Sequence, residues 1–164
     1  EQSYRYFMNR NLFEQIDIPP ENTHVPNGQG DVDAGAAAYE CAIEEIGGID
    51  LQLLGIGNNG HIGFNEPGTP FGSPTHRITL TPSTREANAR FFTSIDEVPT
   101  EAVSMGIKTV MRARAILMIA TGGAKADIVR AAFLGPVTEE VPASVLQLHP
   151  DVEWFLDYEA ARLL

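Results

Sequence analysis

The sequence is poor in cysteine, in positive charge and in long apolar runs, and each shortage excludes a class of protein. Cys41 is the single cysteine, and one thiol cannot form an intrachain disulfide, so a secreted disulfide scaffold is excluded. Residues 36–42 have a helical, partly apolar pattern, and we expect Cys41 to be a packed structural thiol. No apolar run approaches the roughly 18 residues that a membrane span needs, and no signal-peptide pattern opens the sequence. We therefore expect a cytoplasmic protein.

The shortage of positive charge bears on partners. Lys and Arg number 11 against 22 Asp and Glu, which gives a net charge of −11 at pH 7. A field of that sign repels nucleic acid and phospholipid surfaces, so neither is an expected partner. A small anionic ligand remains compatible with the acidic balance, because one or two cations can dominate the charge of a pocket.

The length and composition fit one globular domain. The chain has 164 residues, of which 43% are hydrophobic, enough for a core. Low-complexity segments and repeats of fixed period are lacking. The sequence begins Glu1-Gln2-Ser3 without an initiator Met and enters a helical pattern at once. We therefore expect a natural N-terminal segment ahead of Glu1.

Short apolar runs alternate with segments of helical periodicity, which predicts an α/β fold. Residues 50–56 and 115–120 have the composition of buried parallel strands, with 152–156 as a third candidate and 77–80 as a weaker one. We expect a Rossmann-like three-layer sandwich with a mostly parallel sheet. Helices are predicted at 4–15, 31–46, 84–91, 100–105 and 124–133, with a last one at the C-terminal end.

A Gly- and Pro-rich segment, residues 57–75, follows the first predicted strand, and a loop of this length is usually functional. It lies at the carboxyl end of a strand, where ligands bind in open parallel sheets. Gly55, Gly57 and Gly60 match G-x-G-x-x-G, but a dinucleotide site requires a long helix next, which Pro67 prevents. We expect Gly57 and Gly60 to let the backbone approach a ligand and to offer it N–H groups.

Within this loop, His61 and Glu66 lie five residues apart. A carboxylate beside a histidine holds the imidazole in one tautomer and raises its pKa. Such a histidine can carry a proton to and from a sugar oxygen near neutral pH. The alternative is a loop histidine with a chance acidic neighbour, and the residues alone leave both open.

A second loop, residues 121–125, follows the strand predicted at 115–120 and opens a helix. Small residues at a helix N-terminus form a ready anion site, and Lys125 adds a formal charge. The pattern is not a Walker A loop, which needs G-x-x-x-x-G-K. A solvated lysine in a first helical turn is the alternative.

The string Gly60-His61-Ile62-Gly63-Phe64-Asn65-Glu66-Pro67, within residues 53–68, closely resembles the signature of glucosamine-6-phosphate deaminases. The resemblance continues through residues 84–92, 124–126 and 144–150, so that it covers essentially the whole chain. It implies that glucosamine 6-phosphate, a phosphorylated amino sugar, is converted to fructose 6-phosphate and ammonia without a cofactor.

The resemblance also implies residue roles. His61 would move the proton that opens the pyranose ring, with Glu66 as its partner. Asn59 stands where some family members have an acid and others an amide, so it can hydrogen-bond but carries no charge. Lys125 and Arg90 would contact the sugar phosphate. The other histidines are not spaced with Cys or His as metal ligands are, and we expect no metal.

Two elements of the family's deaminases do not occur in residues 1–50: a Gly-Gly-Ser/Thr phosphate loop and an Asp that acts as the base in enolisation. We therefore expect residues 1–164 to form one N-terminally truncated sugar-phosphate isomerase/deaminase domain that lacks its N-terminal strand or strands. We expect these residues to be inactive on their own. Two alternatives stay open. One is a 6-phosphogluconolactonase-like hydrolase, against which residues 64–67 argue, and the other is a non-catalytic sugar-phosphate-binding module.

The sequence leaves the oligomeric state open and allows a homo-oligomer. Some family members are hexamers that an acetylated amino sugar phosphate regulates. In those proteins, basic residues stand where this chain has His76 and Ile78. We therefore expect no activation by that compound.

Overall fold

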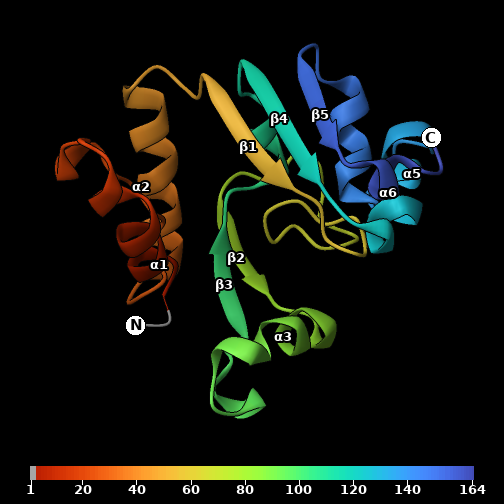
Figure 1. Ribbon diagram of the computed structural model, residues 1–164. Helices are drawn as coiled ribbons and strands as arrows, with labels where there is room; N and C mark the ends of the chain where they lie inside the picture. The colour runs from red at the N-terminus through yellow and green to blue at the C-terminus, as the bar shows by residue number, and fades with distance from the viewer. Residues whose placement is uncertain (1–2) are drawn as a thin grey trace.

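The computed structural model describes residues 3–164, apart from the side chains of residues 83 and 87. Its main sheet has three parallel strands in the order β1-β4-β5, and a separate antiparallel pair is formed by β2 and β3 (Figure 1). The strands are β1 (Leu51–Gly55), β2 (His76–Thr79), β3 (Glu101–Ser104), β4 (Ala115–Ala120) and β5 (Val152–Leu156). The α-helices are α1 (Tyr4–Asn11), α2 (Val32–Glu45), α3 (Pro82–Asn88), α4 (Ile107–Met111), α5 (Ala126–Leu134) and α6 (Tyr158–Ala161).

The prediction of an α/β fold with a parallel sheet is confirmed. Leu53 of β1 pairs with Leu117 of β4, and Met118 of β4 pairs with Trp154 of β5, both in parallel register. The apolar composition of these runs is typical of strands in parallel sheets, whose two faces are usually covered. Among the described residues, no helix is both long and apolar enough to cross a membrane.

The core lies on one face of the parallel sheet. Leu54, Ile116 and Met118 point into it and pack with α4, α5 and the short 3₁₀ segment Pro142–Leu148. Side chains on the opposite face of the sheet are exposed to solvent. Leu53, next to the buried Leu54, is 59% exposed. Leu51, Ile119 and Phe155 are exposed on the same face. The sheet therefore carries an uncovered apolar face, which is unusual for parallel strands.

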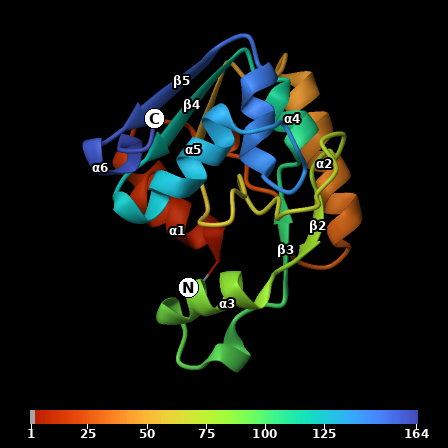
Figure 2. The same cartoon turned by 90° about the vertical axis from the view of Figure 1, so that its right-hand side faces the viewer.

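The β2–β3 pair and α3 extend away from the body of the molecule, beyond the carboxyl ends of the parallel strands (Figures 1 and 2). The helix predicted at 100–105 is wrong, because this segment is β3. Ala102 pairs with Ile78, and Val103 with Arg77, in an antiparallel register. The partner strand lies some 25 residues away in sequence, so local helical preference gives way to long-range pairing.

Three further expectations need correction. The first helix ends at Asn11, since Leu12 leaves the helical region and the chain continues as the 3₁₀ turn Phe13–Gln15. Helix α4 was not predicted; it begins after Gly106, where a Cβ atom would lie 2.0 Å from the Pro74 carbonyl oxygen. Cys41 is exposed on α2, so the expectation of a packed thiol is also wrong.

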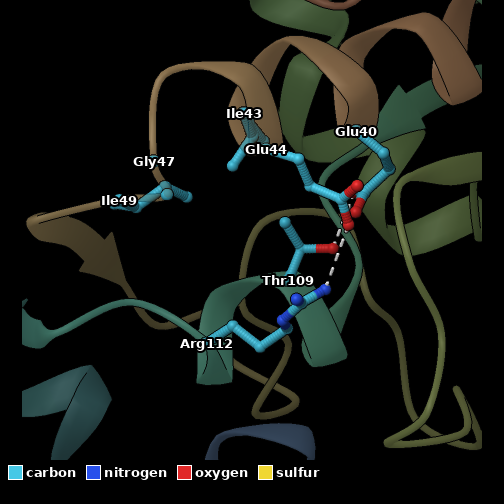
Figure 3. A pocket seen from close by; sticks show the side chains of 8 residues that line it. Glu40, Ile43, Glu44, Gly47, Ile49, Thr109 and Arg112 are labelled. Carbon is cyan, nitrogen blue, oxygen red and sulfur yellow. Dashed lines mark hydrogen bonds and ion pairs between the residues drawn. The ribbon is translucent and has the colours of Figure 1, made fainter.

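Helix α2 is joined to the body through Glu40, at a hollow of about 380 Å³ between α2 and α4 (Figure 3). The Glu40 carboxylate accepts hydrogen bonds from the Thr75 backbone N–H at 2.8 Å and the Thr109 hydroxyl at 2.7 Å. Arg112 lies 3.5 Å from Glu44 at the rim of the hollow. The polar groups of the hollow are thus engaged in contacts that join α2 to α4, and we interpret the hollow as structural.

Candidate active site

The first element of the candidate site is the tight turn after β1, which places His61. The His61 ring lies so close to the Gly57 backbone that a Cβ atom there would be 2.3 Å from the imidazole Cε1. Gly60 has φ of +88°, and a Cβ there would lie 2.9 Å from Val141 Cγ1. Both positions therefore require glycine for steric reasons.

The amides of these two glycines are engaged within the turn. The Gly57 N–H donates to the His61 carbonyl at 2.9 Å, and the Gly60 N–H donates to the Gly57 carbonyl at 3.0 Å. They are therefore not the free ligand donors that the sequence led us to expect. In the structure, Gly57 and Gly60 shape the turn that supports His61.

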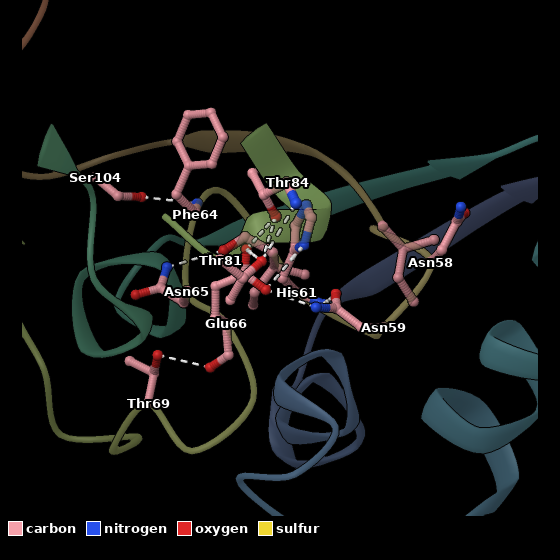
Figure 4. Close-up of polar contacts among 12 residues, drawn as sticks. Asn58, Asn59, His61, Phe64, Asn65, Glu66, Thr69, Thr81, Thr84 and Ser104 are labelled. Carbon is pink, nitrogen blue, oxygen red and sulfur yellow. Dashed lines mark hydrogen bonds and ion pairs between the residues drawn. The ribbon is translucent and has the colours of Figure 1, made fainter. Parts of the chain in front are cut away.

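The next part of the loop is fixed from inside by Asn65, which is fully buried. Its amide group donates to the Ile62 carbonyl at 2.8 Å and to the Met105 carbonyl at 2.9 Å. The Phe64 N–H donates to the Ser104 hydroxyl at 3.0 Å (Figure 4). These bonds join the loop to the end of β3, so the side chains on either side of Asn65 have a defined place.

Glu66 is 8% exposed, and its carboxylate is surrounded by donors (Figure 4). Oε1 accepts a hydrogen bond from the Thr84 hydroxyl and a second from the Thr81 hydroxyl at 3.3 Å. Oε2 accepts from the Asn59 amide at 2.6 Å and lies 3.5 Å from His61 Nδ1. The predicted proximity of His61 and Glu66 is thus present in the structure as a close electrostatic contact, longer than a good hydrogen bond.

Asn59 links the two members of this pair. Its amide nitrogen donates to the Glu66 carboxylate, while its Oδ1 accepts from the His61 backbone N–H at 3.2 Å. Asn59 therefore contacts the backbone of His61 and not its imidazole. The side chain aligns the carboxylate with the turn and adds no charge.

The electrostatic environment of His61 differs from the expectation. Burial lowers the pKa of His61, the Glu66 carboxylate raises it, and the Lys125 ammonium lowers it. The net direction is downward, because loss of hydration outweighs the attraction of Glu66. Glu66 thus raises the pKa of His61 as expected, but the expectation of a raised net pKa is wrong, and the imidazole is mostly neutral at pH 7.

We expect two charge-removing substitutions to move the pKa of His61 in opposite directions. Glu66→Gln removes the attraction that favours the imidazolium and should lower that pKa further. Lys125→Met removes a repulsion and should raise it. NMR titration of the His61 Cε1–H signal measures both shifts. His149→Gln, at a distant histidine, is the control and should leave the pKa of His61 unchanged. Shifts of the same sign in the two variants would contradict this electrostatic description.

Lys125 lies at the junction of β4 and α5 and reaches across to the first loop. Its Nζ donates to the Ile56 carbonyl at 2.8 Å and to Asn58 Oδ1 at 2.6 Å. Burial lowers the pKa of Lys125. An ammonium has three donors, and these contacts use two of them. One N–H therefore remains for a ligand at the carboxyl ends of β1 and β4.

The anion site predicted at the start of this helix already holds an internal carboxylate. Gly122 has φ of +88°, and its N–H donates to both carboxylate oxygens of Asp157, at 3.0 and 2.9 Å. Asp157 also caps α6 through the Ala160 N–H. An external anion would meet this negative charge, so the Gly122 amide is not a free phosphate donor.

Arg90 is exposed in the segment after α3, with its guanidinium 4.7 Å from the centre of the Phe91 ring. No polar contact within residues 3–164 joins Arg90 to Lys125 or to His61. The structure thus brings Lys125, but not Arg90, into electrostatic contact with His61. Arg85 donates to the carbonyls of Ile95 and Val98.

The sequence analysis missed Thr81 and Thr84, which bind Glu66 from 15 and 18 residues away. It also missed Asn58, whose side chain holds Lys125. Threonines at a helix start are ordinary caps, so the sequence offered no signal for this contact. Across residues 3–164, no group of three or more His, Cys, Asp or Glu side chains could hold a metal ion.

The chain has an open parallel sheet with a His–Glu pair beyond the carboxyl end of β1, and comparison with known proteins identifies its family. The chain belongs to the glucosamine-6-phosphate isomerases/6-phosphogluconolactonase family, whose model matches residues 1–154. It is 57% identical over 163 residues to a glucosamine-6-phosphate deaminase of Geobacillus sp., covering 99% of this chain and 65% of that protein. It is 60% identical over 153 residues to that of Lachnoclostridium phytofermentans, covering 93% and 65%.

Solved structures agree with this assignment. A structure described as a monomeric glucosamine-6-phosphate deaminase matches with a TM-score of 0.95 at 48% identity, covering 99% of this chain and 68% of that one. A 6-phosphogluconolactonase from Trypanosoma cruzi matches with a TM-score of 0.63 at 22% identity, covering 87% and 55%, and so shares the fold. The chain spans 65% of the length of the two curated relatives.

Proposed function

We propose that this chain takes part in the isomerising deamination of glucosamine 6-phosphate, in which the sugar and water give fructose 6-phosphate and ammonia. The observation that carries the proposal is the partly buried His61–Glu66–Asn59 cluster in a glycine-shaped turn, where the Lys125 ammonium also acts on the His61 charge. We further propose that residues 1–164 belong to one sugar-phosphate isomerase/deaminase domain.

His61 is suited to the ring-opening step. Burial keeps its imidazole neutral at pH 7, so it can accept the proton of the anomeric hydroxyl as the bond between C1 and the ring oxygen breaks. The same proton is then returned to the ring oxygen. Glu66 stabilises the imidazolium that exists between the two transfers, because its carboxylate lies 3.5 Å from Nδ1.

The later steps need a second base. Moving a proton from C2 to C1 of the open amino sugar, together with a proton from the amino nitrogen to O1, gives an imine at C2, and water then replaces the nitrogen as ammonia. Glu66 is committed to three donors and to His61. Asp157, at the ends of β4 and β5, is held by two backbone amides. Neither carboxylate is free to take the C2 proton.

Lys125 supplies a phosphate contact in this proposal. We expect Lys125→Ala to weaken binding of glucosamine 6-phosphate by about 1.5–3 kcal/mol, the scale of a charge-assisted hydrogen bond. That range corresponds to roughly 10- to 150-fold in Kd. Calorimetric titration with the phosphorylated and the unphosphorylated sugar measures the effect, and the second ligand should barely respond.

The chain offers a matched control, because it has two lysines and the other, Lys108, is exposed on α4. Lys108→Ala should leave binding of both sugars unchanged. Equal losses for the two sugars in Lys125→Ala would refute the phosphate role of Lys125.

The family also contains lactonases, so the deaminase and a 6-phosphogluconolactonase-like hydrolase must be separated by product. Ammonia released from glucosamine 6-phosphate supports the deaminase, whereas acid released from 6-phosphogluconolactone supports the hydrolase. A chain that binds the phosphorylated sugar but turns over neither compound, even when joined to the remaining part of a related deaminase, would be a non-catalytic binding module.

A further inference from the structure

Glu66 is bound by a helix that the sequence does not associate with the His61 loop. Thr84, in the first turn of α3, is 6% exposed, and its hydroxyl donates to Glu66 Oε1 (Figure 4). The hydroxyl of Thr81 lies 3.0 Å from that of Thr84 and 3.3 Å from the same carboxylate oxygen. Two hydroxyls of one helix start thus converge on one oxygen of Glu66.

The Thr84 hydroxyl is not needed by its own helix. Thr81 is the N-cap of α3, where its side chain accepts from the Thr84 backbone N–H at 3.3 Å. The Thr84 carbonyl accepts from the Asn88 side chain at 2.8 Å. Besides its 3.0 Å contact with the Thr81 hydroxyl, the Thr84 hydroxyl donates to the carboxylate of another segment.

The consequence of this bond lies at the other carboxylate oxygen. A hydrogen bond to an ionised acceptor is about twice as strong as a neutral one, and rotation of the Glu66 carboxylate would break it. While Oε1 is held by the threonines, Oε2 stays against the Asn59 amide and 3.5 Å from His61 Nδ1. Without the Thr84 bond, only the weaker Thr81 contact at 3.3 Å would remain on Oε1 among the described residues, so the Asn59 bond to Oε2 would hold that orientation less firmly.

We propose that Thr84 is a positioning residue, whose hydroxyl holds Glu66 so that Oε2 of the carboxylate faces His61. Thr84 touches neither the imidazole nor any reacting atom and acts only through Glu66. The proposal rests on the proposed function for the role of the His61 proton in the reaction. The contacts between Thr84, Glu66 and His61 do not depend on turnover.

The test is the pKa of His61 in the 164-residue chain, measured by NMR titration. The chain has four histidines, and the His61 signal is identified by its loss in His61→Gln. Among the described groups, Glu66 and Lys125 act on the His61 charge. Glu66→Gln gives the full downward shift expected when the carboxylate charge is lost, and this shift is the reference.

We expect Thr84→Val, which removes the hydroxyl at nearly constant shape, to lower the pKa of His61 by at least half of that reference shift. Thr84→Ser keeps the hydroxyl and should restore the original value. Thr69→Val is the matched control, because the Thr69 hydroxyl donates to the Glu66 backbone carbonyl at 2.7 Å and not to its carboxylate. It should leave the pKa of His61 unchanged. Thr84→Ala replaces Thr84→Val if the valine variant does not fold.

The proposal is overturned if the pKa of His61 in Thr84→Val and Thr84→Ala stays at the original value or rises. It is equally overturned if Glu66→Gln produces no shift, since Glu66 would then not act on His61. The expected shifts without deaminase activity in any setting would uphold the role of Thr84 and reject the proposed function. Deaminase activity together with an unchanged pKa of His61 in the Thr84 variants would uphold the proposed function and reject the role of Thr84.

Discussion

His61→Ala is expected to lower turnover of glucosamine 6-phosphate by about 10²–10⁴-fold, the usual contribution of a positioned proton carrier. The reason is specific to this site. The imidazole is partly buried, kept mostly neutral by its surroundings and aligned by a carboxylate that is itself held by Thr84 and Asn59. A water molecule in the space left by alanine would have neither the right pKa nor a fixed position.

The measurement requires a setting in which all steps can proceed. A suitable one is a chimera in which these 164 residues replace the matching 163-residue stretch of the Geobacillus deaminase, with which they share 57% identity. His24→Ala is the control, since His24 is exposed and lies outside the described site. Unchanged turnover in the His61→Ala chimera, beside an unchanged His24→Ala chimera, would refute the role of His61.

The 164 residues alone are expected to release ammonia at least 10²–10⁴-fold more slowly than the chimera, the range for loss of a general base. The C2–H bond of an amino sugar is a weak carbon acid and needs a positioned base. Within residues 3–164, the carboxylates at the site, Glu66 and Asp157, are both committed to hydrogen-bond donors. Lys125 also offers a phosphate a single N–H donor, which by itself binds and positions the substrate weakly.

A coupled assay for fructose 6-phosphate, run on the chain and on the chimera at equal concentrations, measures this difference. The uncovered apolar face at Leu53 and Phe155 could lower the folded fraction of the isolated chain, so circular dichroism must first show that both proteins are folded. Comparable turnover from the two would mean that one of the described residues serves as the base and that our assignment of Glu66 is incomplete.

The parallel sheet could be predicted because its signals are local. The apolar runs that form β1, β4 and β5 are short, bounded by turn residues and almost uniformly hydrophobic, and few other structures suit such a composition. Strand β3 could not be predicted in the same way. Residues 101–104 become a strand by pairing with β2, and no local pattern specifies a partner across an intervening helix.

The candidate site was predictable in part for the same reason. His61 and Glu66 lie in one loop, and the glycines around them marked that loop as unusual. The contact from Thr84 depends on how α3 folds back onto the loop, and the sign of the His61 pKa depends on burial and on Lys125, which is distant in sequence. Occupation of the Gly122 amide by Asp157 likewise arises only when β4 and β5 lie side by side.

We propose that these residues form the proton-transfer site of a glucosamine-6-phosphate deaminase. The most direct measurement is the product yield of the chimera, with ammonia and fructose 6-phosphate quantified in the same reaction. We predict that the two products form in equal amounts and that both are lost together in the His61→Ala chimera. A folded chimera that binds glucosamine 6-phosphate but releases neither product, or that instead hydrolyses 6-phosphogluconolactone, would contradict the account.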